Sequence, residues 1–311
     1  MISKTYLVTG AAGFIGAALA KQFIEQGSKV VTIDNLSTGF RESIPEGVIF
    51  IEGNCQDESI INQLNSYQFD AIFHIAGQSS GEISFEDPVY DLQTNVQSTL
   101  LLLKYALKTN CKKFIYTSTM SVYGDQPNIP ITEEVSTLPK SFYAVGKLAS
   151  EYYLKIYSKY NIDVVALRLF NVYGPGQNME NLKQGMISIF LAQALSNKHI
   201  SVKGNPERFR DFVYIDDIVD SFKIILEANE LGYRCYNIST GVRTTISDLL
   251  HKIITCLPFE VSVEYSGSTP GDQFGIYGDA NKIAKELGWK YQTDLNQGLK
   301  KMINSILTCN E

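Results

Sequence analysis

Short apolar runs alternate with amphipathic stretches through the first half of the chain. The runs are rich in β-branched and aromatic residues, which is typical of strands, whereas the stretches between them follow a helical period. The predicted strands are Tyr6–Thr9, Lys29–Ile33, Val48–Ile51, Ala71–Ile75, Lys113–Ser118 and Val164–Leu169. The predicted helices are Phe14–Gln26, Asp57–Asn65, Val89–Lys108 and Phe142–Lys159. This βαβα order predicts an α/β fold with a doubly wound, Rossmann-type parallel sheet covered on both faces.

The regular alternation ends after Phe170. Residues 171–178 are rich in Gly and Pro and predict a loop. Later helices are predicted at Met186–Ser196, Asp216–Ala228, Ile246–Cys256, Ala280–Leu287 and Leu295–Ile306, with strands near Ile200 and Phe212 and at Cys235–Ile238 and Val261–Tyr265. We therefore expect a Rossmann domain over residues 1–170 and a smaller mixed α/β lobe over residues 171–311, with some segments near 211–240 returning to the first domain.

Composition excludes several classes of protein. The chain has 311 residues and a net charge of -6, which argues against a nucleic-acid partner. Its five cysteines are widely spaced without a C-x-x-C, so we predict neither a disulfide framework nor a zinc site, and a reducing compartment, the cytoplasm, fits best. The three histidines have no metal-ligand spacing, so no metal is predicted. No apolar run is long enough for a membrane span.

Three glycines follow the first predicted strand and open the first helix. In Gly10-x-x-Gly13-x-x-Gly16 they allow a tight turn, close approach of a pyrophosphate and close helix–strand packing. These fixed positions favour a phosphate loop over a signal peptide for this run of small residues. Asp34 ends the second strand, where a carboxylate binds adenosine ribose hydroxyls and repels a 2′-phosphate. The sequence therefore favours NAD over NADP; the alternative is a structural turn with a solvated Asp34.

Tyr143 and Lys147 are four residues apart in a predicted helix and share one face of it. A lone Y-x-x-x-K is common by chance, but this helix follows a strand that ends in the hydroxyl run Thr117–Thr119, where ligands of open parallel sheets bind. Lowering the pKa of a tyrosine from ~10 to ~7 needs about 4 kcal/mol, and a nearby ammonium acts in that direction. Thr119 would hydrogen-bond the reacting hydroxyl, and the cofactor would take a hydride.

These features resemble the extended short-chain dehydrogenase/reductase family, specifically nucleotide-sugar 4-epimerases of the UDP-glucose 4-epimerase type. The resemblance covers essentially the whole chain. The matching segments are Val8–Gly16, Asp34–Gly39, His74–Gly77, Asn95–Val96, Tyr123–Gly124, Tyr143 with Lys147, Arg168–Gly176, Arg210–Asp217, Pro270–Asp272 and Leu287–Trp289.

The resemblance implies a role for each matching position. The NAD site would comprise Gly10, Gly13, Phe14, Ile15 and Gly16 at the pyrophosphate, Asp34, Asn35, Asn54 and Cys55 at the adenosine, and Ala76, Gly77, Gln78, Asn95, Tyr143 and Lys147 at the nicotinamide. The catalytic residues would be Thr119, Tyr143 and Lys147. The substrate would contact Thr119, Asn171, Met186, Arg210 and Asp272. Asn54 departs from the family pattern, which usually has Asp there.

The residues after Thr119 narrow the reaction. Related 4,6-dehydratases carry an Asp-Glu pair there and decarboxylases usually carry a Glu, whereas this chain has Met120-Ser121. The resemblance thus implies 4-epimerisation of a UDP-hexose, such as glucose, galactose or their N-acetyl forms, through a transient 4-keto sugar. Another nucleotide-sugar oxidoreductase or epimerase, for example a 4-dehydrogenase or uronate epimerase, is the alternative. A non-catalytic dinucleotide-binding regulator is an alternative of a different class.

Further features bear on the substrate and the assembly. Thr269 stands where the family often has a phosphate-binding Arg, and Ile276 aligns with a pocket-gating position that is Tyr in some relatives. The resemblance implies a homodimer formed by the helices Val89–Lys108 and Phe142–Lys159. We interpret His74 as a packed core residue. We interpret Asp216 and Asp217 as acids with a structural role at the start of a helix.

Overall fold

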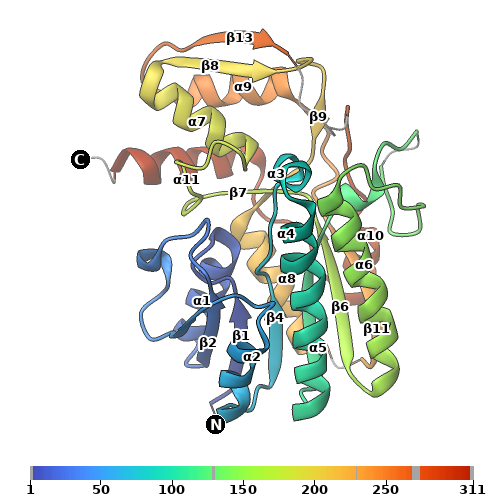
Figure 1. Cartoon of the computed structure of the whole chain (residues 1–311). Coiled ribbons are helices and arrows are strands. Elements are labelled where there is room, and N and C mark those ends of the chain that lie inside the picture. Colours follow the sequence, from blue (N-terminus) through green and yellow to red (C-terminus); the bar gives the residue numbers. More distant parts are fainter. Residues whose placement is uncertain (1–2, 128–129, 229, 268–273, 309–311) are drawn as a thin grey trace.

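A parallel seven-stranded sheet forms the centre of the molecule in the computed structural model, which describes residues 3–127, 130–228, 230–267 and 274–308. All six strand pairs of this sheet are parallel. In spatial order its strands are β11 (Gly232–Ile238), β6 (Asp163–Leu169), β5 (Lys113–Thr119), β4 (Ala71–His74), β1 (Thr5–Thr9), β2 (Lys29–Asp34) and β3 (Ile49–Glu52). The doubly wound α/β fold predicted from the strand pattern is therefore confirmed (Figure 1).

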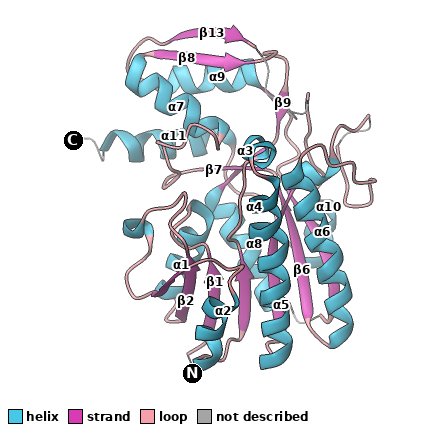
Figure 2. Cartoon of the chain, viewed as in Figure 1, coloured by secondary structure: helices cyan, strands magenta, loops and turns pink. Residues whose placement is uncertain are grey.

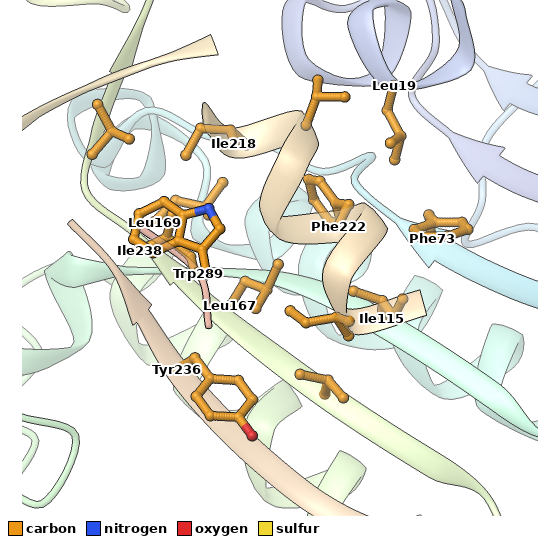
Figure 3. Packing of buried hydrophobic residues seen from close by; sticks show 14 of the residues in the cluster. Leu19, Phe73, Ile115, Leu167, Leu169, Ile218, Phe222, Tyr236, Ile238 and Trp289 are labelled. Atoms are coloured by element: carbon orange, nitrogen blue, oxygen red, sulfur yellow. The ribbon is translucent and has the colours of Figure 1, made fainter. Parts of the chain in front are cut away.

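Helices cover both faces of the sheet, so each face has its own apolar core. One face is packed by α1 (Phe14–Glu25), α8 (Ile215–Glu227) and α10 (Asn281–Leu287), the other by α2 (Glu58–Gln63), α5 (Ser98–Thr109) and α6 (Phe142–Tyr157). In Figure 3, Phe222 of α8 lies on the side of its helix that faces Leu19 of α1 and Phe73 of β4. The Phe222 and Phe73 rings meet edge to face at 6.0 Å. Truncating such a ring to alanine typically costs about 3–5 kcal/mol.

A second lobe lies beyond the carboxyl ends of the strands, around a third apolar cluster. It contains α7 (Met186–Asn197), β8 (His199–Lys203), α9 (Ile246–Cys256), β13 (Ser262–Ser266) and α11 (Leu295–Thr308). Two short pairs join the lobes: β7 (Asn171–Tyr173) with β10 (Phe212–Tyr214), and β9 (Phe209–Arg210) with β12 (Thr244–Thr245). Asp217 accepts the N–H groups of Gln292 and Thr293 at 2.7 and 3.1 Å, which confirms its structural role.

The structure corrects two predictions of local structure. The segment 171–178, predicted as a loop, begins with strand β7. The helix predicted over Val89–Lys108 is divided into α4 (Pro88–Leu92), a π-helical turn at Gln93–Gln97 and α5. The short helix α3 (Gly81–Glu86) just before α4 was not predicted from the sequence.

Short 3-10 turns complete the secondary structure (Figure 2). They are Arg41–Ser43, Leu64–Ser66, Met120–Tyr123 and Ser158–Tyr160. Across the ranges that the structure describes, no helix has both the length and the apolar character that spanning a bilayer requires.

Candidate active site

A cavity of about 610 Å³ opens where the carboxyl ends of the strands face the second lobe. This volume lies within the ~300–1,000 Å³ usual for small-molecule sites. The glycine loop and Asp34 line one end, and Thr119, Tyr143 and Lys147 line the other. The structure thus brings the two chemical motifs of the sequence into one cavity, at the edge of the sheet where open α/β folds bind ligands.

The glycine loop packs as its spacing predicts. Gly10 has φ +79°, and a Cβ there would lie 2.9 Å from the backbone nitrogen of Ala76. A Cβ on Gly16 would lie 2.1 Å from the carbonyl oxygen of Gly10, so helix α1 and the loop approach more closely than a side chain allows. Neither a capping side chain nor an acidic residue occupies the first turn of α1. Its N–H groups therefore present their positive end to the cavity, beside Phe14 and Ile15.

Asp34 ties the end of β2 to the glycine loop. Its Oδ2 accepts the N–H of Ala12 at 2.9 Å, and its Oδ1 accepts the N–H of Leu36 at 2.9 Å. Next to it, the Asn35 amide donates to Asn54 Oδ1 at 2.9 Å. Asn35 and Cys55 line the cavity, whereas Asn54 supports Asn35 from behind and is not among the described lining residues.

The adjoining wall, residues 75–78, is held by Thr9 at the end of β1. Thr9 Oγ1 accepts the N–H groups of Ile75 and Ala76, each at 3.1 Å, and its proton points to His74 Nδ1 at 2.9 Å. His74 is fully buried, and burial lowers its pKa to about 3, so the ring is neutral at pH 7. The interpretation of His74 as a core residue is confirmed, and this core residue fixes the loop that carries Ala76, Gly77 and Gln78 into the cavity.

Tyr143 and Lys147 project from one face of α6, whose first turn is capped by Ser141. Lys147 Nζ donates to the carbonyl oxygen of Thr117 at 3.0 Å and lies 5.9 Å from the centroid of the Tyr143 ring. Thr119, at the end of β5, lines the same cavity, where its hydroxyl donates to Ser121 Oγ at 3.2 Å and lowers the pKa of the Tyr143 phenol. The three residues predicted as catalytic therefore form one cluster at the mouth of the sheet.

Burial dominates the electrostatics of this cluster. It raises the pKa of Tyr143 to about 12, against the lowering effect of the nearby Thr119 hydroxyl. It lowers the pKa of Lys147 to about 8. In the protein alone the phenol is therefore protonated at pH 7, and Lys147 remains mostly charged.

The predicted substrate residues have different surroundings. Asn171 and Met186 line the cavity, and the Asn171 amide donates to the carbonyl oxygen of Asp211 at 3.1 Å. Arg210 is buried and donates to the carbonyl oxygen of Phe209 at 2.7 Å; it is not among the described residues that line the cavity. Asp272 and Thr269 lie outside the described residues.

The structure corrects the prediction for one residue, Ile276, and adds one residue, Asp91, that was not predicted. Ile276 is fully buried in the core that packs one face of the sheet, so it does not gate the cavity as its alignment suggested. Asp91, which was not predicted, is buried near the Lys147 end of the cavity, where it bonds the cavity residue Gln78 and the predicted residue Asn95. Its i,i+4 spacing to Asn95 on a predicted helix was a signal that could have revealed it.

Comparison with known proteins agrees with this geometry. The model of the NAD dependent epimerase/dehydratase family matches residues 6–239. A relative from Methanocaldococcus jannaschii, described as a putative UDP-glucose 4-epimerase, is 33% identical over 96% of this chain and 97% of its own length. The chain belongs to the NAD-dependent epimerase/dehydratase family.

Solved structures agree with the family. A Thermotoga maritima UDP-glucose 4-epimerase with UDP-glucose superposes with a TM-score of 0.95 at 32% identity, covering 99% of this chain and 100% of that one. A UDP-N-acetylglucosamine 4-epimerase from Methanobrevibacter ruminantium, in complex with UDP-N-acetylmuramic acid, gives 0.92 at 30% identity, covering 99% and 100%.

The cavity fits the NAD of this family. The glycine loop leaves its backbone open to the cavity, as a pyrophosphate would require, and Asp34 lines the cavity beside it with carboxylate oxygens of the kind that ribose hydroxyls would need. At the other end, Gly77 keeps space beside Lys147, since a Cβ there would lie 3.5 Å from Lys147 Nζ. It would also lie 2.4 Å from Asn95 Oδ1, a buried oxygen without a hydrogen-bond partner in the described structure.

Proposed function

We propose that this protein is a 4-epimerase of a nucleotide-diphosphate hexose, in which Thr119, Tyr143 and Lys147 are catalytic residues. One observation carries the proposal: these three side chains converge in the same cavity as the glycine loop and Asp34. A cofactor held by the loop would extend its nicotinamide toward Tyr143. Relatives with similarity over nearly the whole chain are named UDP-glucose 4-epimerases, which supports a UDP-hexose as substrate.

The chain's own residues would handle the proton at the sugar O4. Tyr143 accepts the proton of the C4 hydroxyl, and Thr119, which lines the same cavity, orients that hydroxyl. Bound NAD supplies a positively charged ring that accepts and returns a hydride at C4. After the 4-keto sugar rotates, Tyr143 returns the proton to O4 and the configuration at C4 is inverted.

Lys147 would keep Tyr143 competent as a base. Because burial raises the Tyr143 pKa to about 12, the phenol needs neighbouring positive charge to lose its proton near neutral pH. The Lys147 ammonium provides one such charge, and its bond to Thr117 fixes its position. Lowering a pKa of about 12 to ~7 takes roughly 7 kcal/mol, so Lys147 and the bound positive ring must act together.

The second lobe would hold the nucleotide diphosphate. Asn171 is placed at the cavity by β7, and Met186 begins α7 beside it. We also assign Arg210 and Asp272 to the substrate from the resemblance of their segments to the family pattern. A firm grip on the diphosphate leaves the hexose free to turn between its two oxidation-competent orientations.

The residues beside Thr119 favour epimerisation over dehydration. Met120 and Ser121 line the cavity directly after Thr119, and neither side chain can act as the acid or base that eliminates water. Two structurally similar proteins, one solved with UDP-glucose and one with UDP-N-acetylmuramic acid, are 4-epimerases by name.

We further propose a homodimer through α4 and α6. These helices pack side by side and expose Val89, Leu92, Val145, Tyr152 and Ile156, whose exposed fractions lie between 51% and 64%. A continuous apolar face of this kind is typical of a protein interface.

We also propose a cytoplasmic location, which the four described cysteines support because all of them are free thiols.

A substrate panel tests the proposed activity. Purified protein is incubated with UDP-hexoses and their N-acetyl forms without added reductant, and C4 inversion is followed by NMR. We expect inversion of at least one sugar, and loss of most turnover in Tyr143→Phe. Net NADH formation without inversion would replace the proposal with a dehydrogenase, and a biological effect that survives Tyr143→Phe would indicate a regulator.

A further inference from the structure

A buried acid lies beneath the nicotinamide end of the cavity. Asp91, in α4, is 1% exposed. Its Oδ1 accepts the side-chain amide of Gln78 at 2.8 Å and that of Asn95 at 3.1 Å. A buried carboxylate is costly unless it is hydrogen-bonded and paired, so its presence here calls for a functional reason.

The cluster fixes the segment that forms the cavity wall. The Asn95 amide also donates to the backbone carbonyl of Gln78 at 2.9 Å, and the Gln78 N–H donates to Thr94 Oγ1 at 3.4 Å. Gln78 itself lines the cavity. The Asp91 carboxylate is thus the acceptor through which α4 and the following π-helical turn hold Gln78 in place.

The same carboxylate faces the helix that carries Lys147. A Cβ on Gly146 of α6 would lie 3.2 Å from Asp91 Oδ2, so the acid packs directly against the residue before Lys147. The negative charge of Asp91 raises the pKa of Lys147, against burial, which lowers it. Burial is the main cause of the raised pKa of Tyr143, and the charge of Asp91 raises that pKa further.

The other titratable groups of this region do not supply the negative charge that Asp91 places near Lys147. His74 of β4 is neutral at pH 7, and burial raises the pKa of Tyr116 of β5, whose ring lies 4.8 Å from Lys147 Nζ. Glu151, one turn beyond Lys147 on α6, is engaged by Arg168 at 2.6 Å. On α3, Glu86 pairs with Lys183 at 2.8 Å, and Glu82 is half-buried in the first turn.

We propose that Asp91 is a positioning residue for the Tyr143–Lys147 pair: its carboxylate holds Gln78 and Asn95 at the nicotinamide end and balances the ammonium of Lys147. It touches neither the reacting atoms nor the cavity surface among the described residues. The π-helical turn at Gln93–Gln97 is part of this arrangement, since π-turns inside helices frequently mark functional sites. The kinetic part of this inference rests on the proposed function; the electrostatic part does not.

Asp91→Asn tests the charge with little change of shape, because the amide oxygen can still accept from Gln78. The matched control is Asp87→Asn, which makes the same charge change one turn earlier, where Asp87 caps α4 by accepting the N–H of Tyr90 at 2.9 Å. The Lys147 pKa is measured in the NAD-free protein from the ¹³Cε shift of labelled lysine, assigned by its loss in Lys147→Met. NAD affinity is measured by calorimetry.

We expect Asp91→Asn to lower the Lys147 pKa by about one unit or more, while Asp87→Asn leaves it unchanged. Both limbs of the pH profile of epimerisation should move to lower pH, since removing a negative charge lowers the pKa of Tyr143 and Lys147 alike. An unmoved Lys147 pKa with a uniformly lower rate would overturn the proposal. A moved Lys147 pKa in a protein that inverts no sugar would instead reject the proposed function and keep the electrostatic role.

Asp91→Glu covers the case in which Asp91→Asn does not fold. This variant keeps the charge but displaces the oxygen that holds Gln78. We expect the Lys147 pKa to stay near its original value and the NAD affinity to fall several-fold. Unchanged NAD affinity in Asp91→Glu would contradict the holding role.

Discussion

His74 Nδ1 lies 2.9 Å from Thr9 Oγ1, and this contact joins the buried core to the wall of the active site. His74 Nε2 lies 3.1 Å from Ser98 Oγ, whose own proton is donated to Thr94 O. The ring therefore carries its proton on Nε2 and accepts from Thr9 on Nδ1. Protonating Nδ1 would break this bond, and with it the support of Ile75 and Ala76.

Acid should consequently destabilise the fold through His74. Its pKa is about 3 in the folded protein and ~6.5 when unfolded, so the unfolded chain binds the proton first as pH falls. Between those values the free energy of unfolding should decrease by about 1.4 kcal/mol per pH unit from this group. Urea unfolding from pH 7 to pH 4.5 measures the slope. His74→Asn should flatten it, whereas His251→Asn, at an exposed position of α9, should not.

Asp34→Ala should weaken NAD binding by at least about ten-fold. Losing one charged hydrogen-bond acceptor costs about 1.4 kcal/mol of binding free energy, which corresponds to a ten-fold change in affinity. The variant loses both the ribose acceptor and the bond that fixes Ala12 in the glycine loop. Calorimetry with NAD and NADP checks the result, and the preference for NAD over NADP should narrow. Glu52→Gln, at the end of the next strand, is the control. Equal affinity of Asp34→Ala and the unaltered protein would exclude Asp34 from the cofactor site.

The buried pair Glu151–Arg168 should be costly to break on one side. Arg168 Nε and Nη2 bond the two Glu151 oxygens at 2.9 and 2.6 Å, and the Ser118 hydroxyl donates to the same carboxylate. Glu151→Gln should reduce the free energy of unfolding by about 3–5 kcal/mol, because Arg168 is left buried without its counter-charge. Urea unfolding provides the measurement.

Two comparisons make the result for this pair specific. The double variant Glu151→Leu/Arg168→Met should recover much of the lost stability, since it leaves no buried charge behind. Glu58→Gln, which breaks the exposed pair with Lys104, should leave the midpoint unchanged. If the double variant is as unstable as Glu151→Gln, the loss comes from packing and not from charge.

Tyr152→Glu or Ile156→Glu should convert the proposed dimer into monomers. Each places a charge on the exposed apolar face of α6, where it would be buried in the interface. Sedimentation velocity measures the change in mass. Val242→Glu is the control, since Val242 is 49% exposed in the loop before strand β12 and belongs to neither helix. A monomeric unaltered protein, or a dimer unaffected by both charges, would refute this interface.

Local sequence predicts the sheet well because its strands are apolar on both faces. Strand β4, for example, is buried at every position, and its run Ala71–Phe73 is apolar on both faces of the sheet. The break at Gln93–Gln97 was invisible to this reasoning. The helical period continues through it, and the turn widens where Asp91 and Asn95 bond Gln78, a partner remote in the sequence.

Tertiary contacts also explain what the sequence missed elsewhere. Strand β7 forms because Asn171–Tyr173 pairs with Phe212–Tyr214, some forty residues later, and the adjacent Gly and Pro masked it. Ile276 was given a gating position by alignment alone, whereas its packing in the core depends on segments that alignment does not place. The glycine loop and the Tyr143–Lys147 spacing were recognised because their geometry is local to one turn or one helix face.

The most direct test follows the hydrogen on C4 of the sugar. A UDP-hexose that the enzyme accepts is prepared with deuterium at C4 and converted in ordinary water with no added cofactor beyond bound NAD. In this account the hydride leaves C4 and returns to C4, and Tyr143 moves only the proton on O4. The account therefore predicts a C4-inverted product that keeps its deuterium at C4. Loss of the deuterium to solvent, or its appearance in released NADH without an inverted sugar, would contradict the account.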